Sequence, residues 1–274
     1  MLYADDAGIV LKSAEGLAKM MTAIVTDFKA AGLTVYKTET MLLRTQDQAP
    51  RTSPLVIEVA GQRYRQATQF NYLDGLVNAS ADIMPEIKRR VRLVWACYSR
   101  FKRGLYDMEA APFTLKVRML KADVMETLLY GYVTWTLGKE HFAELRTAHH
   151  RFLLRIIDFQ RRNRTDHLVS YAKALKEAQC EGVKTTIRKW RLLFAGAVQW
   201  ANNERLTRPV MFGTMAGGEN PRPGRPEKNW AKCLVDDLRV FRATEGSTQS
   251  VPLEFGVETV LWCTAAKKGG KWYR

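Results

Sequence analysis

The sequence predicts an α+β fold that becomes mainly α-helical after residue 78. Two observations support this fold class. Short β-prone runs and one helical pattern alternate over residues 1–78, whereas apolar residues recur with a helical period from Asp82 onward. The composition, with 46% hydrophobic residues and 9 prolines in 274 residues, excludes a disordered or collagen-like chain and is sufficient for one large or two modest cores.

The first 78 residues are predicted to form short strands and one helix. Leu2-Tyr3 and Ile9-Val10-Leu11 are β-prone and flank Ala4-Asp5-Asp6-Ala7-Gly8, a pattern typical of a tight hairpin. Ser13 suits a helix N-cap and Gly32 suits the end of that helix. The apolar positions between them are Leu17, Met20, Met21, Ile24 and Phe28. Further strands are predicted at residues 41–43, 55–59 and 70–77.

A helical period governs the chain from Asp82. Pro85 suits the first turn of a helix. The apolar stripe behind it consists of Ile87, Val91, Val94, Trp95, Tyr98, Phe101 and Leu105. We expect Trp95 and Phe101 to lie in the core because they fall on this stripe. A second helix begins near Thr114, with inward positions at Val117, Leu120, Val124, Leu128 and Leu129. Further helices are predicted at residues 139–157, 169–180, 184–202 and 227–241.

The charge of the chain is basic and uneven. The formal net charge is +15, and residues 61–210 carry 27 basic and 14 acidic side chains. A polyanion is the natural partner of such a field, and nucleic acid fits it better than a membrane surface does.

The cysteine and hydropathy patterns predict an intracellular protein, nuclear or cytoplasmic. The four cysteines are far apart and form no CxxC pair, which favours reduced thiols over a zinc finger or a disulfide framework. Lysine and arginine interrupt every apolar run before it reaches the length of a membrane span. Asp5 and Asp6 stand where a secretory signal would need lysines followed by apolar residues.

Two adjacent carboxylates, Asp5 and Asp6, are the strongest chemical signal in the sequence. Their mutual repulsion is relieved by a hard divalent cation such as Mg²⁺, which binds carboxylate oxygens and keeps water or phosphate as its other ligands. Two such ions can activate a 3′-hydroxyl and stabilise a leaving pyrophosphate. The alternative interpretation is a solvated turn without a metal, because four residues are a short motif.

Tyr3-Ala4-Asp5-Asp6, followed by a helix and then by Gly32-Leu33-Thr34-Val35 and Lys37-Thr38, resembles the reverse transcriptases of non-LTR (LINE-like) retrotransposons. Blocks dispersed as far as residue 242 also resemble this family. They are Tyr72-Leu73-Asp74-Gly75, Leu128-Leu129-Tyr130-Gly131 with Thr134-Trp135, His149-His150-Arg151, Leu153 to Ile157, Arg191 to Gly196, and Gly224-Arg225-Pro226 through Trp230.

The resemblance implies a division of the chain and a set of site residues. Residues 1–78 would be a partial polymerase palm, 79–136 a helical thumb, 137–215 a basic helical region, 216–226 a linker, and 227–274 a helix and a tail. Asp5 and Asp6 would bind the two Mg²⁺ ions, Tyr3 and Ala4 would lie near the primer end or the nucleotide, and Lys37 would contact the pyrophosphate or act as a general acid. The implied partners are an RNA template with a DNA primer, an RNA/DNA duplex, and dNTP.

Three departures from the family pattern limit the implied chemistry. The spacing before Lys37 is shorter than usual, and Asp74 replaces a glycine at a tight turn, which predicts backbone strain there. A complete palm also needs a third aspartate and fingers, which in the family precede the Tyr-Ala-Asp-Asp motif. We therefore expect a truncated, catalytically incomplete reverse transcriptase that still binds nucleic acid. The alternatives are a non-enzymatic RNA- or DNA-binding module derived from a retroelement, and a pseudogene product without a stable role.

Clustered cations interleave with aromatic residues after residue 87. The predicted phosphate-binding residues are Lys88, Arg89, Arg90, Arg92, Arg100, Lys102, Arg103, Arg151, Arg155, Arg161 and Arg162. Residues 88–103 contain no acid, so a polyanion would relieve their repulsion. The alternative is a core helix with a solvated basic face. The spacing of His149, His150, His167 and Cys180 matches no ordinary zinc finger, which favours surface or helix-packed histidines.

Overall fold

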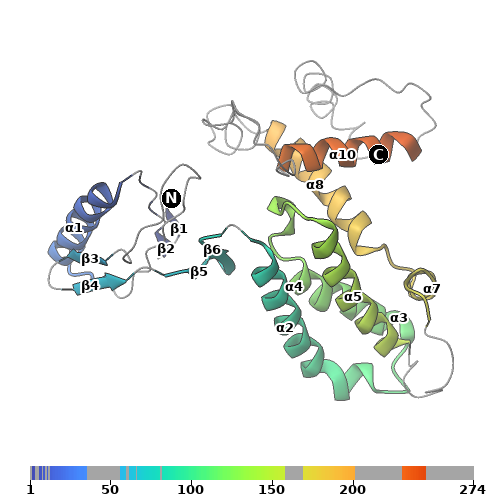
Figure 1. Cartoon of the computed structure of the whole chain (residues 1–274). Helices are drawn as coiled ribbons and strands as arrows, with labels where there is room; N and C mark the ends of the chain where they lie inside the picture. The colour runs from blue at the N-terminus through green and yellow to red at the C-terminus, as the bar shows by residue number, and fades with distance from the viewer. Residues whose placement is uncertain are drawn as a thin grey trace. The chain divides into compact units, whose positions relative to one another are not determined.

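A computed structural model describes residues 2–3, 6–7, 9, 11, 13–35, 56–59, 62–65, 67–80, 82–157, 169–200 and 230–244 (Figure 1). The chain divides into two compact units, residues 1–89 and 90–274. The described part of the first unit contains short antiparallel hairpins and one long helix, and the secondary-structure elements described in the second unit are helices. The predicted dominance of α-helix is confirmed. The predicted strand at residues 41–43 and the predicted linker at 216–226 lie outside the described residues.

The first hairpin is shorter than predicted. β1 (Leu2–Tyr3) pairs with β2 (Asp6–Ala7), so the second strand begins at Asp6. The prediction of a strand at residues 9–11 is wrong at Ile9 and Leu11, which lie outside any strand and are 38% and 42% exposed. Two-residue connections are the commonest in hairpins. The pairing of Tyr3 with Asp6 therefore closes the hairpin within the Tyr-Ala-Asp-Asp tetrapeptide rather than around it.

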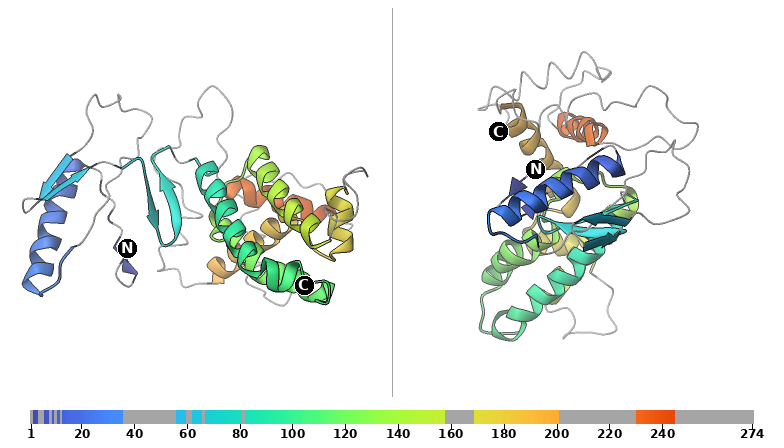
Figure 2. Two further views of the ribbon diagram at one scale, coloured as in Figure 1. Left: turned by 90° about the horizontal axis from the view of Figure 1, so that it is seen from below. Right: turned by 90° about the vertical axis from the view of Figure 1, so that its left-hand side faces the viewer.

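The predicted helix after Ser13 is confirmed. Helix α1 (Ala14–Ala30) begins at Ser13, whose hydroxyl accepts a hydrogen bond from the Gly16 N–H at 3.1 Å. The helix ends before Gly32, whose φ of +75° is favourable for glycine. Met21 is buried against Leu17 and Val25. Helix α1 packs against β3 (Val56–Val59), which pairs with β4 (Gln62–Arg65) in the hairpin that lies beside the helix in Figure 2.

The predicted strand at residues 70–77 is two strands joined by a tight turn. β5 (Gln69–Tyr72) pairs with β6 (Gly75–Asn78), with Tyr72 opposite Gly75. The two turn residues, Leu73 and Asp74, have φ angles of +48° and +58°. Positive φ at both central positions defines a type I′ hairpin turn, for which Asn-Gly is the preferred sequence. The strain predicted at Asp74 is confirmed, and Leu73 shares it.

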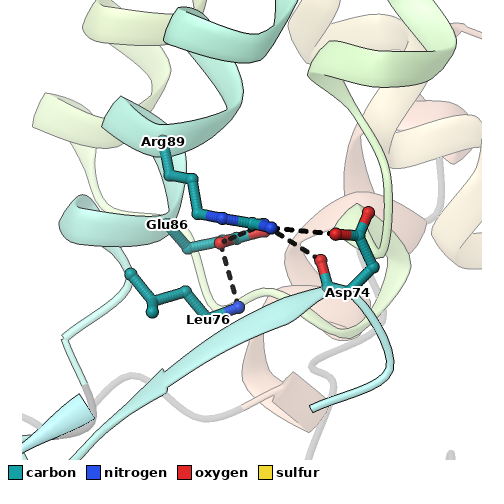
Figure 3. Close-up of polar contacts among 4 residues, drawn as sticks. All are labelled: Asp74, Leu76, Glu86 and Arg89. Atoms are coloured by element: carbon teal, nitrogen blue, oxygen red, sulfur yellow. Dashed lines mark hydrogen bonds and ion pairs between the residues drawn. The ribbon is translucent and has the colours of Figure 1, made fainter. Parts of the chain in front are cut away.

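Arg89 joins this turn to helix α2 (Met84–Phe101) (Figure 3). The Arg89 guanidinium donates to the Asp74 carboxylate at 2.8 Å and to the Asp74 carbonyl at 3.0 Å. It also contacts the buried Glu86 carboxylate at 3.5 Å, and Glu86 accepts from the Leu76 N–H at 3.0 Å. Helix α2 thereby holds the β5–β6 hairpin in its strained conformation.

Replacing Leu73 with asparagine is expected to stabilise the β5–β6 hairpin by about 0.5–1 kcal/mol, because asparagine adopts positive φ more readily than leucine. Native-state hydrogen exchange of the amides of Gln69–Asn78 measures this gain. Val77→Asn is the matched control, since Val77 is equally exposed at 38% and its φ is not positive. Equal slowing of exchange in both variants would contradict the turn explanation.

The helical unit follows the predicted apolar stripes. After α2 the chain forms a π-helical segment, η1 (Lys102–Tyr106), then α3 (Phe113–Met119), a second π-helical segment, η2 (Leu120–Met125), and α4 (Glu126–Leu128). The predicted inward positions of the second helix are all buried, from Val117 at 7% exposed to Leu120, Val124 and Leu128 at 0%. Tyr98 of α2 stacks on Tyr106, with ring centroids 4.6 Å apart.

Four further helices occur where they were predicted. After the 3-10 turn η3 (Tyr132–Thr134) come α5 (Lys139–Ile156), α7 (Tyr171–Glu177), α8 (Val183–Trp200) and α10 (Trp230–Thr244). Helix α8 contacts both α5 and α10 (Figure 1). Ala195, Leu234 and Leu238 form the core between α8 and α10, and the Trp230 indole donates to the Val133 carbonyl at 2.7 Å. Within the described ranges, every helix is too short or too polar to cross a bilayer.

Candidate nucleic-acid interface

The Tyr3-Ala4-Asp5-Asp6 segment marks the turn of the β1–β2 hairpin. Tyr3 and Asp6 are cross-strand partners, so the chain enters and leaves the turn at the two ends of this tetrapeptide. Ala4, Asp5, Lys37 and the side chains of Tyr3 and Asp6 lie outside the described part of the structure. Among the described residues, no three His, Cys, Asp or Glu side chains gather as metal ligands. The Mg²⁺ site at Asp5 and Asp6 stays a prediction.

Two of the cations predicted on α2 are engaged inside the protein. Arg90 is 2% exposed, and its guanidinium carbon lies 4.4 Å from the centroid of the Tyr130 ring. The Arg89 side chain is 19% exposed, and its hydrogen bond to Asp74 raises its pKa. The burial of Arg90 removes it from the surface that a large ligand could reach.

The other predicted cations of this stretch are exposed: Lys88, Arg92, Arg100, Lys102 and Arg103. With 100° per residue, Lys88 and Arg92 of α2 lie about 40° apart around the helix axis and at least about 100° from the fully buried Ile87 and Val94. Arg103 follows α2 in the π-helical segment η1. Lys102 makes a long contact of 3.9 Å with Asp107. We define the exposed basic face of α2 as Arg92 and Arg100, which lie about 80° apart around the helix axis, together with Arg103 in the adjoining η1.

Helix α5 brings a second predicted cluster to α2. The Arg155 guanidinium carbon lies 4.7 Å from the Trp95 ring centroid and 5.6 Å from that of Tyr98. Arg151, one helical turn before Arg155, is exposed. Arg161 and Arg162 lie outside the described residues. The structure therefore brings Arg155 of α5 to the Trp95 and Tyr98 rings of α2 within the second unit.

The contact between Arg155 and Trp95 could not be predicted from the local pattern. The helical period places Trp95 and Phe101 on the apolar stripe, but both are half-buried rather than fully enclosed. The Trp95 ring packs on Phe152, with centroids 4.5 Å apart, and the Arg155 guanidinium also lies against the Trp95 ring. Periodicity shows that a residue faces a neighbouring helix, but it does not show which side chain of that helix it meets.

The third basic cluster, in α8, is used for internal packing. Arg191 is 2% exposed and donates to the Asp237 carboxylate at 2.6 Å and to the Trp135 carbonyl at 3.2 Å. Arg188 binds the other oxygen of Asp237 at 3.1 Å. Lys189 pairs with Glu181 at 3.3 Å. Arg188 and Arg191 thus join α8 to α10, and the carboxylate partners of all three cations compete with any external anion.

The adjacent histidines of α5 are packed between helices. His149 is 1% exposed, and its Nδ1 shares a hydrogen bond of 2.9 Å with the Tyr171 hydroxyl. That hydroxyl also accepts from the Val183 N–H at 3.1 Å. Burial, together with the charge of His150, lowers the pKa of His149 to about 4. His150 contacts the Val169 carbonyl at 2.8 Å. His167 lies outside the described residues.

Comparison with known proteins gives one informative relationship. The chain is 26% identical to an uncharacterized transposon-derived protein of Caenorhabditis elegans over 273 residues, which cover 98% of this chain and 92% of that protein. No family model matches the chain, and no solved structure matches it significantly. The similarity suggests a transposon origin for the whole stretch rather than for one motif.

Proposed function

We propose that this chain derives from the reverse transcriptase of a non-LTR retrotransposon and that its helical unit binds an RNA/DNA or template–primer duplex. The exposed basic face of α2, extended by Arg151 and Arg155 of α5, carries the binding part of the proposal. Between Glu86 and Asp107 the sequence contains no acid, so Arg92 and Arg100 have no carboxylate three or four residues away on their own helix. Phosphate oxygens would supply the missing negative charge.

The polymerase part of the proposal is supported by the sequence motifs and by the transposon-derived relative. Asp5 and Asp6 would hold Mg²⁺, which would supply charge stabilisation at the phosphoryl group when bound. The pairing of Tyr3 with Asp6 supports a tight hairpin at this motif. In the complete polymerase the reaction would be RNA-templated DNA synthesis from dNTP.

A salt titration of duplex binding tests the function. We expect the triple variant Arg92→Gln, Arg100→Gln, Arg103→Gln to bind a fluorescent RNA/DNA duplex about tenfold or more weakly at low salt. We expect the slope of log K against log[KCl] to become shallower by about 2.7, since each lost phosphate contact removes roughly 0.9. Fluorescence anisotropy over a range of KCl concentrations measures both quantities.

The matched control is Lys139→Gln, Lys173→Gln, Lys176→Gln. It removes the same charge from other exposed positions, on α5 and α7. It should keep most of the affinity and of the slope. Equal losses in both triple variants would mean that net charge alone drives binding, and the proposed face would then be rejected.

A non-enzymatic binding module is the second candidate function. It is favoured by one observation: the basic face from Arg92 onward belongs to residues 90–274, whereas the carboxylate hairpin belongs to residues 1–89. If Asp5→Asn and Asp6→Asn leave duplex binding and its dependence on Mg²⁺ unchanged, the binding-module function gains over the polymerase function.

A further inference from the structure

Trp95 occupies an unusual place on α2. Its neighbours on the apolar stripe, Ile87 and Val94, are fully buried, whereas Trp95 is half-buried. Its ring meets Phe152 at 4.5 Å and the edge of Tyr98 at 6.2 Å, and the Arg155 guanidinium lies over it at 4.7 Å. Trp95 thus lies at the boundary between the aromatic core and the exposed basic face.

Among the described residues, the partners of Arg155 are two aromatic rings. Within the described ranges no carboxylate forms an ion pair with Arg155, and its guanidinium faces Trp95 and Tyr98. A stacked guanidinium keeps its N–H groups at the rim of the plane, where they can still donate to a phosphate in bidentate geometry. Tryptophan provides the strongest cation–π platform of the aromatic residues.

The spacing along α2 places another cation beside this stack. Arg92 lies three residues before Trp95, so the two side chains are neighbours on the helix surface. Arg92 is exposed one helical turn before the ring over which Arg155 lies. A duplex backbone that reached Arg155 could therefore offer another phosphate to Arg92.

We infer that Trp95 is a positioning residue that holds Arg155 at the surface of α2, so that α2 and α5 bind phosphates of one duplex together. This inference rests on the proposed duplex binding and adds the structural reason for a tryptophan at position 95. Packing alone would be served by an aliphatic residue, as at Ile87 and Val94. A test of this role must therefore distinguish two effects of replacing Trp95, the loss of Arg155 orientation and the loss of core packing.

A double-mutant cycle in the full chain provides this separation. The variants are Trp95→Leu, Arg155→Gln and the double variant, assayed with the fluorescent RNA/DNA duplex at several KCl concentrations. We expect Arg155→Gln to make the salt slope shallower by about 0.9. We expect Trp95→Leu to weaken binding about threefold to tenfold and to make the slope shallower in the same direction. In the Arg155→Gln background, Trp95→Leu should cause no further loss of binding.

Two more variants control for folding. Trp95→Phe keeps an aromatic face and should retain most of the binding, so it remains informative if Trp95→Leu is poorly folded. Phe101→Leu changes another half-buried aromatic of α2 and should lower the unfolding temperature without changing the salt slope. Additive losses in the double variant, or an unchanged slope in Trp95→Leu, would overturn the positioning role. Absence of salt-dependent binding by the wild-type chain would instead overturn the proposed function.

Discussion

Replacing Asp237 with alanine is expected to lower the free energy of unfolding of the helical unit by about 3–5 kcal/mol. Asp237 is 2% exposed and neutralises Arg191 at 2.6 Å and Arg188 at 3.1 Å. Without the carboxylate, the Arg191 guanidinium stays buried with the Trp135 carbonyl as its remaining described partner. An uncompensated buried charge is far more costly than a lost surface pair, and α10 would separate from α8 first.

Asp236→Ala is the matched control for this prediction. Asp236 precedes Asp237 on the same helix and pairs with Arg239 at 3.6 Å, where both side chains are more than half exposed. Its loss should cost no more than about 1 kcal/mol. Urea unfolding followed by tryptophan fluorescence compares the two variants, since Trp135 and Trp230 lie at this junction. Similar midpoints for both variants would show that the Asp237 cluster does not stabilise the unit.

The helical unit is expected to lose about 3 kcal/mol of stability between pH 7 and pH 4 through His149 alone. The folded state holds the pKa of His149 at about 4, against 6.5 for an unperturbed histidine. Between these two pKa values the unfolded state therefore binds more protons than the folded state, so the free energy of unfolding decreases as the pH falls. The stabilising contribution is fully present above pH 6.5. It is lost as the pH falls towards 4, because the imidazole becomes protonated in the unfolded state while the buried imidazole stays neutral.

The pH dependence of unfolding in wild type and in His149→Gln isolates this contribution. The difference in free energy of unfolding between the two proteins should change by about 3 kcal/mol over this pH range, because all other titrating groups are common to both. His141→Gln removes a histidine from the first turn of α5 and keeps the His149–Tyr171 pair. If the stabilities of His149→Gln and wild type depend on pH in the same way, the prediction that His149 is buried in its neutral form is wrong.

The helices from Asp82 onward could be predicted because their signal is local. A period of 3.6 residues places Val117, Leu120, Val124 and Leu128 on one face, and burial on that face follows whatever the partner is. The N-cap at Ser13 and the glycine stop at Gly32 are equally local signals. The positive φ at Asp74 could be anticipated in a different way, from the resemblance, because Asp74 stands where the family pattern has glycine.

The short strands and the contacts at the site depend on which distant segments and side chains meet. The local sequence pattern does not specify these partners. The polar β4 segment gave no apolar alternation, yet it pairs with β3 along its whole length. Arg90 was predicted to bind phosphate, but it is 2% exposed and lies against Tyr130, which is distant in sequence. The contact between Arg155 and Trp95 likewise joins α5 to α2, which no local sequence signal connects.

The π-helical segments have a consequence for how the helical unit tolerates a change in chain length. A π-helical turn contains about one residue more than an α-helical turn. Deleting a single residue within Lys102–Tyr106 would let the backbone relax to α-helical winding and leave the preceding helix unchanged. The same deletion in the middle of Met84–Phe101 would rotate every later side chain by about 100° relative to the earlier ones, so that Val94 and Tyr98 would no longer lie on the same buried face as Ile87. Single-residue deletions should therefore be tolerated within the π-helical segments and should disrupt core packing within the α-helices.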